Sequence, residues 1–470
     1  MRRWWILAGS SVGLFMLMLD STAIALALPA IRLDLGASGS GIQWAQNIYL
    51  LALAALVVTL GRLGDLFGRR LVFGSGLVVF AAGSVVCATA DSIAVLVAGR
   101  AVQGVGGAAM LALSLAIATV AFPPDQRGRA IAIWAAVSSI ALAIGPLVGG
   151  AMVEVASWRW LFWLNVPLAL VALVVIGAAM PESRDDSAGR HIDLGGLLTL
   201  GAGLSAVVLA LVEGKGWGWT SAATLGSLAA GLALLGAFVA IELRVREPLM
   251  DLSLFRSRPY LGATAAAFAL VGAYWTVMFL LPQYLDLALQ FSTARAGVLM
   301  LPVTAPMAVL SPLAARLAAR YGARIVMTVG MACATVAMIT LTRLDGSSNY
   351  YDVAPGLILF GLALGLVYAP MSAAAMSALP SEKAGVASGA LAMSRCVAGA
   401  VLLAAAGAVF GHVQIEERAD GASFEGAFAL GIADACWVLA AVLAVGTVLT
   451  WLLIRSADAP REPHHRRFHL

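Results

Sequence analysis

Two charged residues lie inside long apolar stretches of the sequence. Asp20 stands about eight residues before Leu28, and Arg100 about seven residues after Ile93. At a helical rise of about 1.5 Å per residue, both would lie roughly 10–12 Å below the same end of their helices. Charge at such a depth in a membrane is costly and usually functional. We therefore predict that Asp20 and Arg100 meet, and that Asp20 carries a proton whose binding releases Arg100. A purely structural ion pair is the alternative.

The cysteine and histidine residues do not indicate a metal site or a catalytic site. The four cysteines lie in apolar stretches without the spacing of metal ligands, and the five histidines lie between such stretches or near the C-terminal end. We expect no metal, no cofactor other than the proton as coupling ion, and no enzyme activity. The residues concerned are Cys87, Cys333, Cys396, Cys436, His191, His412, His464, His465 and His469.

The composition places these side chains in a membrane. The chain has 470 residues, of which 61% are hydrophobic and only 11% charged, whereas a soluble domain carries about 25% charged residues. Its apolar stretches have the length of about 20 residues that crosses a bilayer. The sequence therefore predicts an all-α polytopic membrane protein with about 14 transmembrane helices. They are expected near Trp5–Leu28, Ile42–Leu60, Leu71–Ala90, Ile93–Val120, Ile131–Val153, Leu161–Met180, Leu194–Val212, Leu225–Ile241, Leu261–Leu281, Gly297–Ala318, Ile325–Leu341, Pro355–Met376, Gly385–Phe410 and Ala427–Ile454.

The positive charges between these stretches predict the orientation. If the connections alternate between the two membrane sides, one side receives 21 of the 29 Lys and Arg residues and the other receives 6, with Arg100 and Arg395 inside helices. Cytoplasmic loops carry the excess of Lys and Arg. We therefore expect a multi-pass protein of the cell membrane with both termini in the cytoplasm. Because the basic residues set topology, the pI near 9.0 does not indicate nucleic-acid binding.

A weak internal repeat predicts the domain organisation. Residues 61–70 read GRLGDLFGRR after the second helix, and residues 315–324 read ARLAARYGAR after the tenth. We expect an N-terminal six-helix bundle at 1–189, an inserted helix pair at 190–245, and a C-terminal six-helix bundle at 246–470. In parallel repeats of this kind, the substrate site lies between the halves.

The first copy of the repeat has the residues of a gate. Gly61 and Gly64 would let a neighbouring helix approach closely. Asp65 could meet the positive end of another helix, and the basic residues that follow supply donors. The segment resembles the loop signature of the major facilitator superfamily. The resemblance implies that Gly61, Asp65, Gly68, Arg69 and Arg70 control gating, and we expect Asp65 and Arg70 to close the cytoplasmic side in the outward-facing state.

Five further segments resemble the same superfamily or one of its families. Residues 100–106, RAVQGVG, are similar to its fourth-helix motif, and residues 145–150, GPLVGG, to its antiporter signature, which would rest on Gly145, Pro146, Gly149 and Gly150. The antiporter pattern has a further glycine where this chain has Ala141. Residues 19–29, 158–167 and 384–389 resemble the fourteen-helix drug:proton antiporter family of the EmrB/QacA type, which has Asn where this chain has Ala25.

These resemblances imply a function. We expect a proton-coupled antiporter that exports small amphipathic or cationic compounds by alternating access, and that is monomeric in the bilayer. A dedicated exporter of a single metabolite or antibiotic is the alternative. A membrane-embedded enzyme and a receptor are disfavoured, because no catalytic constellation is visible and neither would need Asp20 and Arg100. Candidate residues of the substrate cavity are Trp44, Asn47, Gln103, Tyr274 and Tyr368.

Overall fold

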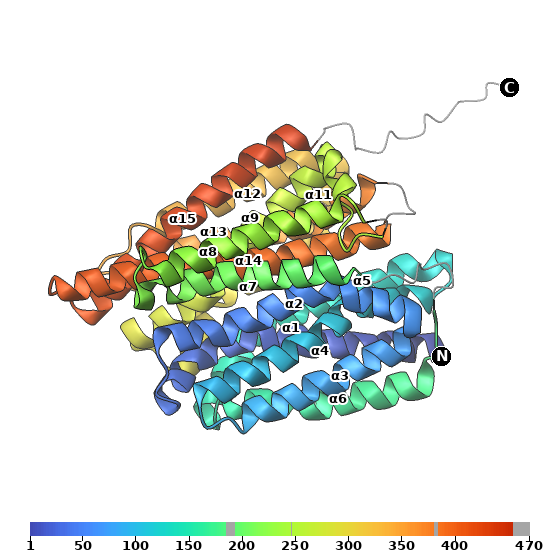
Figure 1. Cartoon of the computed structure of the whole chain (residues 1–470), viewed down its shortest axis with the longest axis horizontal. Helices are drawn as coiled ribbons and strands as arrows, with labels where there is room; N and C mark the ends of the chain where they lie inside the picture. Colours follow the sequence, from blue (N-terminus) through green and yellow to red (C-terminus); the bar gives the residue numbers. More distant parts are fainter. Residues whose placement is uncertain (185–192, 246, 380–383, 455–470) are drawn as a thin grey trace.

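The protein folds into long helices that run roughly parallel to one another. A computed structural model describes residues 1–184, 193–245, 247–379 and 384–454, and Figure 1 shows their arrangement. Within these residues, fourteen helical segments are long and apolar enough to cross a membrane, which confirms the predicted fold class. Each is held by internal backbone hydrogen bonds, as the bilayer interior requires.

The helices form two bundles and a pair between them. The N-terminal bundle consists of α1 (Arg2–Asp34), α2 (Gly39–Phe67), α3 (Arg69–Ala88), α4 (Ile93–Val120), α5 (Pro124–Val155) and α6 (Arg159–Ala179). The pair is α7 (Leu194–Trp217) and α8 (Ala222–Glu242). The C-terminal bundle consists of α9 (Arg258–Gln283), α10 (Thr293–Leu299), α11 (Leu301–Tyr321), α12 (Ala323–Leu341), α13 (Tyr350–Ser377), α14 (Ala384–Ala419) and α15 (Phe424–Leu453), with short helical turns at Leu252–Arg256 and Tyr284–Ala288.

Helix α7 packs against both bundles. It lies beside α2 and α14, while α8 packs on α7 from outside. The indole Nε1 of Trp44 on α2 donates a hydrogen bond of 2.8 Å to the carboxylate of Glu213 on α7. The predicted boundaries of the three units remain our interpretation. In the structure, the inserted pair covers the line of contact between α2 and α14.

Some helix ends differ from those expected. Helix α1 continues from the expected Leu28 to Asp34, whose carboxylate accepts hydrogen bonds from Arg159 at 2.6 Å and Trp158 at 3.1 Å. The expected tenth helix is longer than predicted and is divided at Met300 into α10 and α11, because Pro302 lies in the first turn of α11 and has no backbone N–H to continue the bonding.

The internal repeat is visible in the backbone. Helix α2 ends at Gly68, which has φ of 121°, and α3 begins at the next residue. Helix α11 likewise ends at Gly322, which has φ of 86°, and α12 follows directly. Positive φ values of this kind favour glycine, which lacks Cβ. The two copies of the repeat therefore build the same tight helix–helix turn in the two bundles.

Candidate functional site

Asp20 and Arg100 form an ion pair in the interior of the N-terminal bundle. The guanidinium Nη1 of Arg100 donates to the Oδ2 atom of Asp20 at 2.6 Å. The side chains are 0% and 2% exposed, respectively. The structure thus brings together the two residues that equal depth had predicted to meet. Their role in proton coupling remains a prediction.

Amide groups from two other helices complete the shell around the carboxylate of Asp20. Its Oδ1 atom accepts hydrogen bonds from Asn165 Nδ2 on α6 at 2.8 Å and from Gln103 Nε2 on α4 at 3.3 Å. Both amides also donate to the hydroxyl of Ser84 on α3. Asn165 and Ser84 were not among the residues predicted for the site. Asn165 is a polar residue in the middle of an apolar stretch, and this position could have indicated that it belongs to the site.

The guanidinium of Arg100 has fewer partners than it has donors. Its Nε atom donates to the carbonyl of Ala45 at 3.2 Å, and its Nη1 atom also reaches Gln103 Oε1 at 2.9 Å. The ring of Tyr49 lies 4.1 Å below the guanidinium carbon, as in a cation–π contact. The Nη2 atom is buried without a partner in the described structure. The pair is therefore a closed, neutral unit in which the carboxylate is satisfied and the arginine is not.

The loop motif after α2 contains an ion pair of its own, and the gating role expected for it remains a prediction. Asp65 pairs with Arg69, at 2.8 Å, and not with Arg70. The backbone N–H of Arg70 donates to Glu182 Oε1 at 3.0 Å, and in the described residues its side chain forms no ion pair. A Cβ atom at Gly68 would meet the same Glu182 carboxylate. Glu182 thus caps the start of α3, which the sequence did not reveal.

The two glycines of this motif differ in how tightly α4 packs against them. A Cβ atom at Gly64 would clash with Leu113 of α4, whereas one at Gly61 would lie 3.4 Å from Ala112, an ordinary contact. Tight packing therefore requires glycine at Gly64, while α4 also lies in contact range of Gly61.

The glycines of the antiporter motif lie where α5 meets two other helices. Cβ atoms at Gly145 and Gly149 would run into Thr22 and Ala23 of α1. On the neighbouring face of α5, Gly150 lies against Thr293 of α10, in the other bundle. The motif therefore packs α5 tightly on α1 and joins the two bundles.

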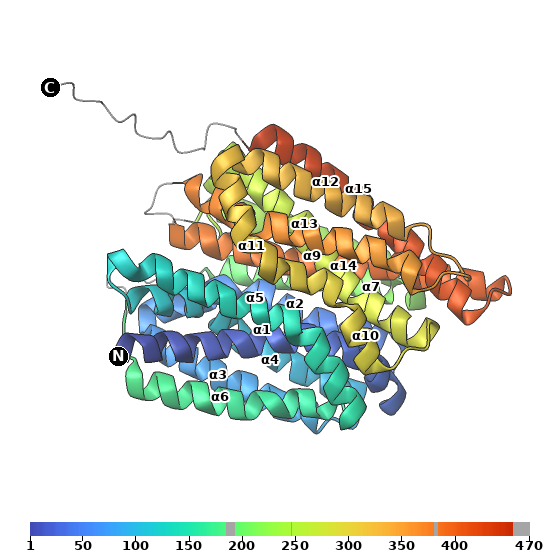
Figure 2. The same cartoon turned by 180° about the vertical axis from the view of Figure 1, so that it is seen from behind.

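A further contact between the bundles involves Pro146. Its carbonyl oxygen lies where a Cβ atom of Gly297 on α10 would be, and α5 runs through Pro146 without a break. Because Gly150 and Pro146 lie in the last turns of α5, these contacts lie toward the side of the membrane away from the termini, which we call the far face (Figure 2). Gln43, near the start of α2, makes a similar contact by donating to the carbonyl of Leu403 on α14 at 3.1 Å.

The residues expected to line a substrate cavity separate into three groups. Gln103 is fully buried in the Asp20 shell, so its amide is already used. Trp44 is bound to the inserted pair. The remaining three lie toward the C-terminal bundle. Asn47 on α2 is 0% exposed and Tyr274 on α9 is 6% exposed, both with polar atoms that lack partners, and Tyr368 on α13 packs under Arg395.

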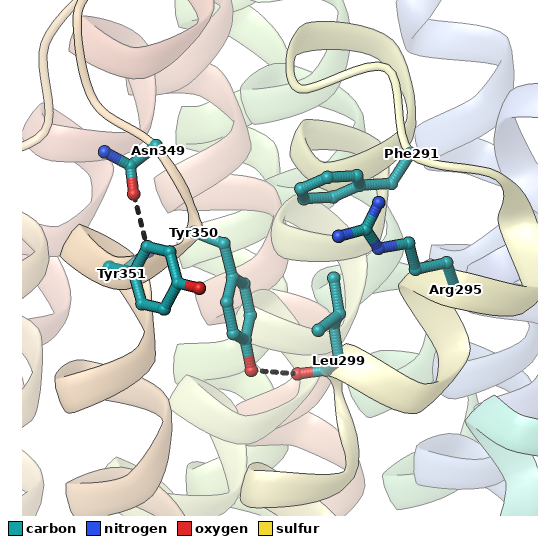
Figure 3. Close-up of a pocket in the computed structure, with 6 residues that line it drawn as sticks. All are labelled: Phe291, Arg295, Leu299, Asn349, Tyr350 and Tyr351. Atoms are coloured by element: carbon teal, nitrogen blue, oxygen red, sulfur yellow. Dashed lines mark hydrogen bonds between the residues drawn. The ribbon is translucent and has the colours of Figure 1, made fainter.

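A pocket of about 260 Å³ lies at the far face of the C-terminal bundle. Figure 3 shows the guanidinium of Arg295 stacked on Phe291, and the hydroxyl of Tyr350 donating to the carbonyl of Leu299 at 3.2 Å. The lining residues come from the segments around the starts of α10 and α13, and none of them was expected at a site. They are Phe291, Arg295, Leu299, Asn349, Tyr350 and Tyr351.

Comparison with known proteins agrees with this architecture. The sequence model of the Major Facilitator Superfamily matches residues 10–403, and the chain belongs to that superfamily of membrane transporters. It shares its fold with the D-xylose–proton symporter, at a TM-score of 0.68 and 14% sequence identity over 97% of this chain and 99% of the other.

Within the superfamily, the chain is related to drug-efflux proteins. It is 34% identical to multidrug resistance protein Stp of Mycobacterium tuberculosis (strain CDC 1551 / Oshkosh), over 86% of this chain and 75% of that protein. It is 36% identical to the tetracenomycin C resistance and export protein of Streptomyces glaucescens, over 83% of this chain and 72% of that protein.

Proposed function

We propose that the protein is a proton-coupled antiporter that exports small amphipathic or cationic compounds by alternating access. The observation that carries this proposal is the buried Asp20–Arg100 pair. It is a carboxylate that can take up a proton, held against a charge that the proton would release. The antiporter-type contacts of α5 and the relationship to drug-efflux proteins support the same conclusion.

Protonation of Asp20 would change what holds the N-terminal bundle together. The neutral acid no longer attracts Arg100, and the guanidinium, which already has an unpaired Nη2 atom, is free to change its contacts. A ligand shifts a conformational equilibrium only through contacts that differ between states, and this pair supplies such a difference. A proton moving inward releases about 2.3 kcal/mol per 100 mV of membrane potential, which would drive export.

The orientation that we propose places both termini in the cytoplasm. The excess of Lys and Arg in the connections at the terminal end supports this, because cytoplasmic loops carry such an excess. In that orientation the far face, where α5 meets α10, is the outer face. Contacts there would have to separate for the protein to open outward.

A dedicated exporter of one compound is the second candidate. It is favoured by the relationship to a protein whose name specifies resistance to, and export of, the single compound tetracenomycin C. A survival screen of an overproducing strain against a compound panel separates the two, since a multidrug exporter protects against several unrelated compounds.

The test of proton coupling uses proteoliposomes that contain a pH-sensitive dye. Addition of a compound found in the survival screen should move protons through the wild-type protein. Asp20→Asn should abolish the proton signal and Asp20→Glu should retain part of it. Asp34→Asn is the matched control, because Asp34 lies on the same helix and its arginine pair has the same 2.6 Å distance, but it is exposed. Substrate-driven proton movement in Asp20→Asn would refute the proposed role of Asp20.

A further inference from the structure

Arg395 is a second arginine inside the membrane-spanning part of the protein. It lies 11 residues after the first residue of α14, and is therefore about 16 Å from that end of the helix. Its Nη2 atom donates to the hydroxyl of Ser372 on α13 at 2.6 Å, and its guanidinium carbon lies 4.6 Å from the centre of the Tyr368 ring. All three side chains are partly exposed.

Arg395 lacks the negative partner that Arg100 has. In the part of the chain that the structure describes, no carboxylate forms an ion pair with Arg395, and its Nε atom is buried without a hydrogen-bond acceptor. A guanidinium at this depth is costly unless an anion or a set of acceptors compensates it. A hydroxyl and an aromatic ring supply only part of that compensation.

Other unsatisfied polar groups face the same junction of helices. The hydroxyl of Tyr274 on α9 is buried without a partner, and it lies within electrostatic reach of Tyr368. The ring of Trp275, which contacts Tyr274, lies against Gly399 of α14, one turn from Arg395.

The N-terminal bundle reaches this junction through α2. Leu50 of α2 also lies against Gly399. One turn earlier, Asn47 is 0% exposed, and neither atom of its amide has a hydrogen-bond partner. Buried polar groups nearly always have partners, so the unpaired groups around this junction are available to bond to a polar ligand.

We propose that Arg395, with the unpaired hydroxyl of Tyr274 as a second donor, binds an acidic oxygen group, such as a carboxylate, of the transported compound. The guanidinium presents parallel N–H groups that match a carboxylate, and the nearby aromatic rings of Tyr368 and Trp275 suit the apolar body of an amphipathic molecule. The proposal rests on the proposed function as an exporter and narrows its substrate class. Compounds with an acidic group, zwitterions included, are preferred to their esters.

Equilibrium binding to the purified full-length protein tests this independently of transport. The protein is placed in nanodiscs of phosphatidylcholine, which supply no anionic lipid. Fluorescence anisotropy then measures the affinity for rhodamine B and for its ethyl ester, which differ at the carboxylate. Because no proton gradient is involved, a failure of proton coupling does not affect the result, and a failure of this test leaves the proposed antiport standing.

The variants are Arg395→Gln, Arg395→Lys and the control Arg418→Gln, which alters an exposed arginine at the far end of the same helix. We expect the wild type to bind the acid more tightly than the ester. Arg395→Gln should weaken binding of the acid about tenfold or more while changing that of the ester about twofold at most. Arg395→Lys keeps the positive charge but loses the paired N–H groups of the guanidinium, so its affinity for the acid should lie between those of the wild type and Arg395→Gln.

Three outcomes would overturn the proposal. The first is a wild type that binds the ester as tightly as the acid, or binds neither. The second is an Arg395→Gln variant whose affinity for the acid and for the ester falls equally, which would indicate that Arg395 only stabilises the fold. Thermal unfolding of Arg395→Lys tests that structural role separately. The third is loss of the acid preference when chloride is added to a buffer that contains no other carboxylate, which would assign the site to small inorganic anions.

Discussion

Burial, and not distance, should decide how much an ion pair contributes to the stability of this protein. The Asp20–Arg100 and Asp34–Arg159 pairs both have N–O distances of 2.6 Å and both involve α1. The side chains of the first pair are 0% and 2% exposed, and those of the second are 33% and 45% exposed. Removing one partner of a buried pair leaves an uncompensated charge and costs about 3–5 kcal/mol, whereas an exposed pair contributes about 0–1 kcal/mol.

A double-mutant cycle on each pair measures this difference. Asp20→Asn and Arg100→Gln should each lower the free energy of unfolding by about 3–5 kcal/mol. The double variant should lose only about 1–2 kcal/mol, because no unpaired charge remains and the amides of Asn165 and Gln103 can bond to the new side chains. The coupling energy is then about 3 kcal/mol or more, against about 1 kcal/mol or less for Asp34→Asn and Arg159→Gln.

The assay is the free energy of unfolding in bicelles, measured by steric trapping at neutral pH. Equal coupling energies for the two pairs would refute the argument, because burial would then make no difference. A double variant of the buried pair that is as unstable as the sum of its single variants would refute it as well. It would mean that the helices need those two side chains for packing and not for charge.

Three further predictions concern topology and the loop motif. A reporter active only in the cytoplasm should function when fused after Leu470 or within 184–190 and fail near Lys215 or Asp345; the reverse pattern would invalidate the orientation. Asp65→Asn and Arg69→Gln should reduce transport equally at normal expression, while Arg70→Gln and Ala319→Asp should change it little. A larger loss in Arg70→Gln than in Arg69→Gln would contradict the importance of the Asp65–Arg69 pair. Gly68→Ala should lower the free energy of unfolding by about 1–3 kcal/mol, because φ is 121° and the new methyl group would meet Glu182, and an unchanged stability would contradict this.

The arrangement of spans could be predicted because it follows from local sequence. An apolar stretch of membrane length has few alternatives to a helix, and the loop charges constrain the number of crossings. What the sequence missed depends on distant contacts. The extension of α1 to Asp34 contains polar residues that hydropathy excludes, and in the structure that end is bonded to Trp158 and Arg159, more than a hundred residues away.

The sequence predicted how deep the site residues lie along their helices, but not which way each helix is rotated about its axis. Depth follows from counting residues along a helix, and it brought Asp20 to Arg100. Which other side chains face Asp20 depends on how α3 and α6 are rotated, and the sequence does not specify this, so Ser84 and Asn165 were missed. The pairing of Asp65 with Arg69 had a signal in the i,i+4 spacing, but Gly68 interrupts the helix between them, and only the structure places the two side chains together.

The two halves share a turn at Gly68 and Gly322 but differ in charge. The N-terminal half encloses a neutral Asp20–Arg100 pair, and the C-terminal half has Arg395 without a described carboxylate partner. If the proton acts on the first and an acidic group on the second, the two ligands need not compete for one carboxylate. Their coupling must then pass through packed contacts between the halves.

Helix α5 provides such a contact. Gly149 of α5 lies against Ala23, one turn from Asp20, and the adjacent Gly150 lies against Thr293 of α10. Because both contacts involve backbone atoms, side-chain rearrangement would not absorb a shift of α1 if protonation of Asp20 produced one, and α5 would then move against the C-terminal bundle.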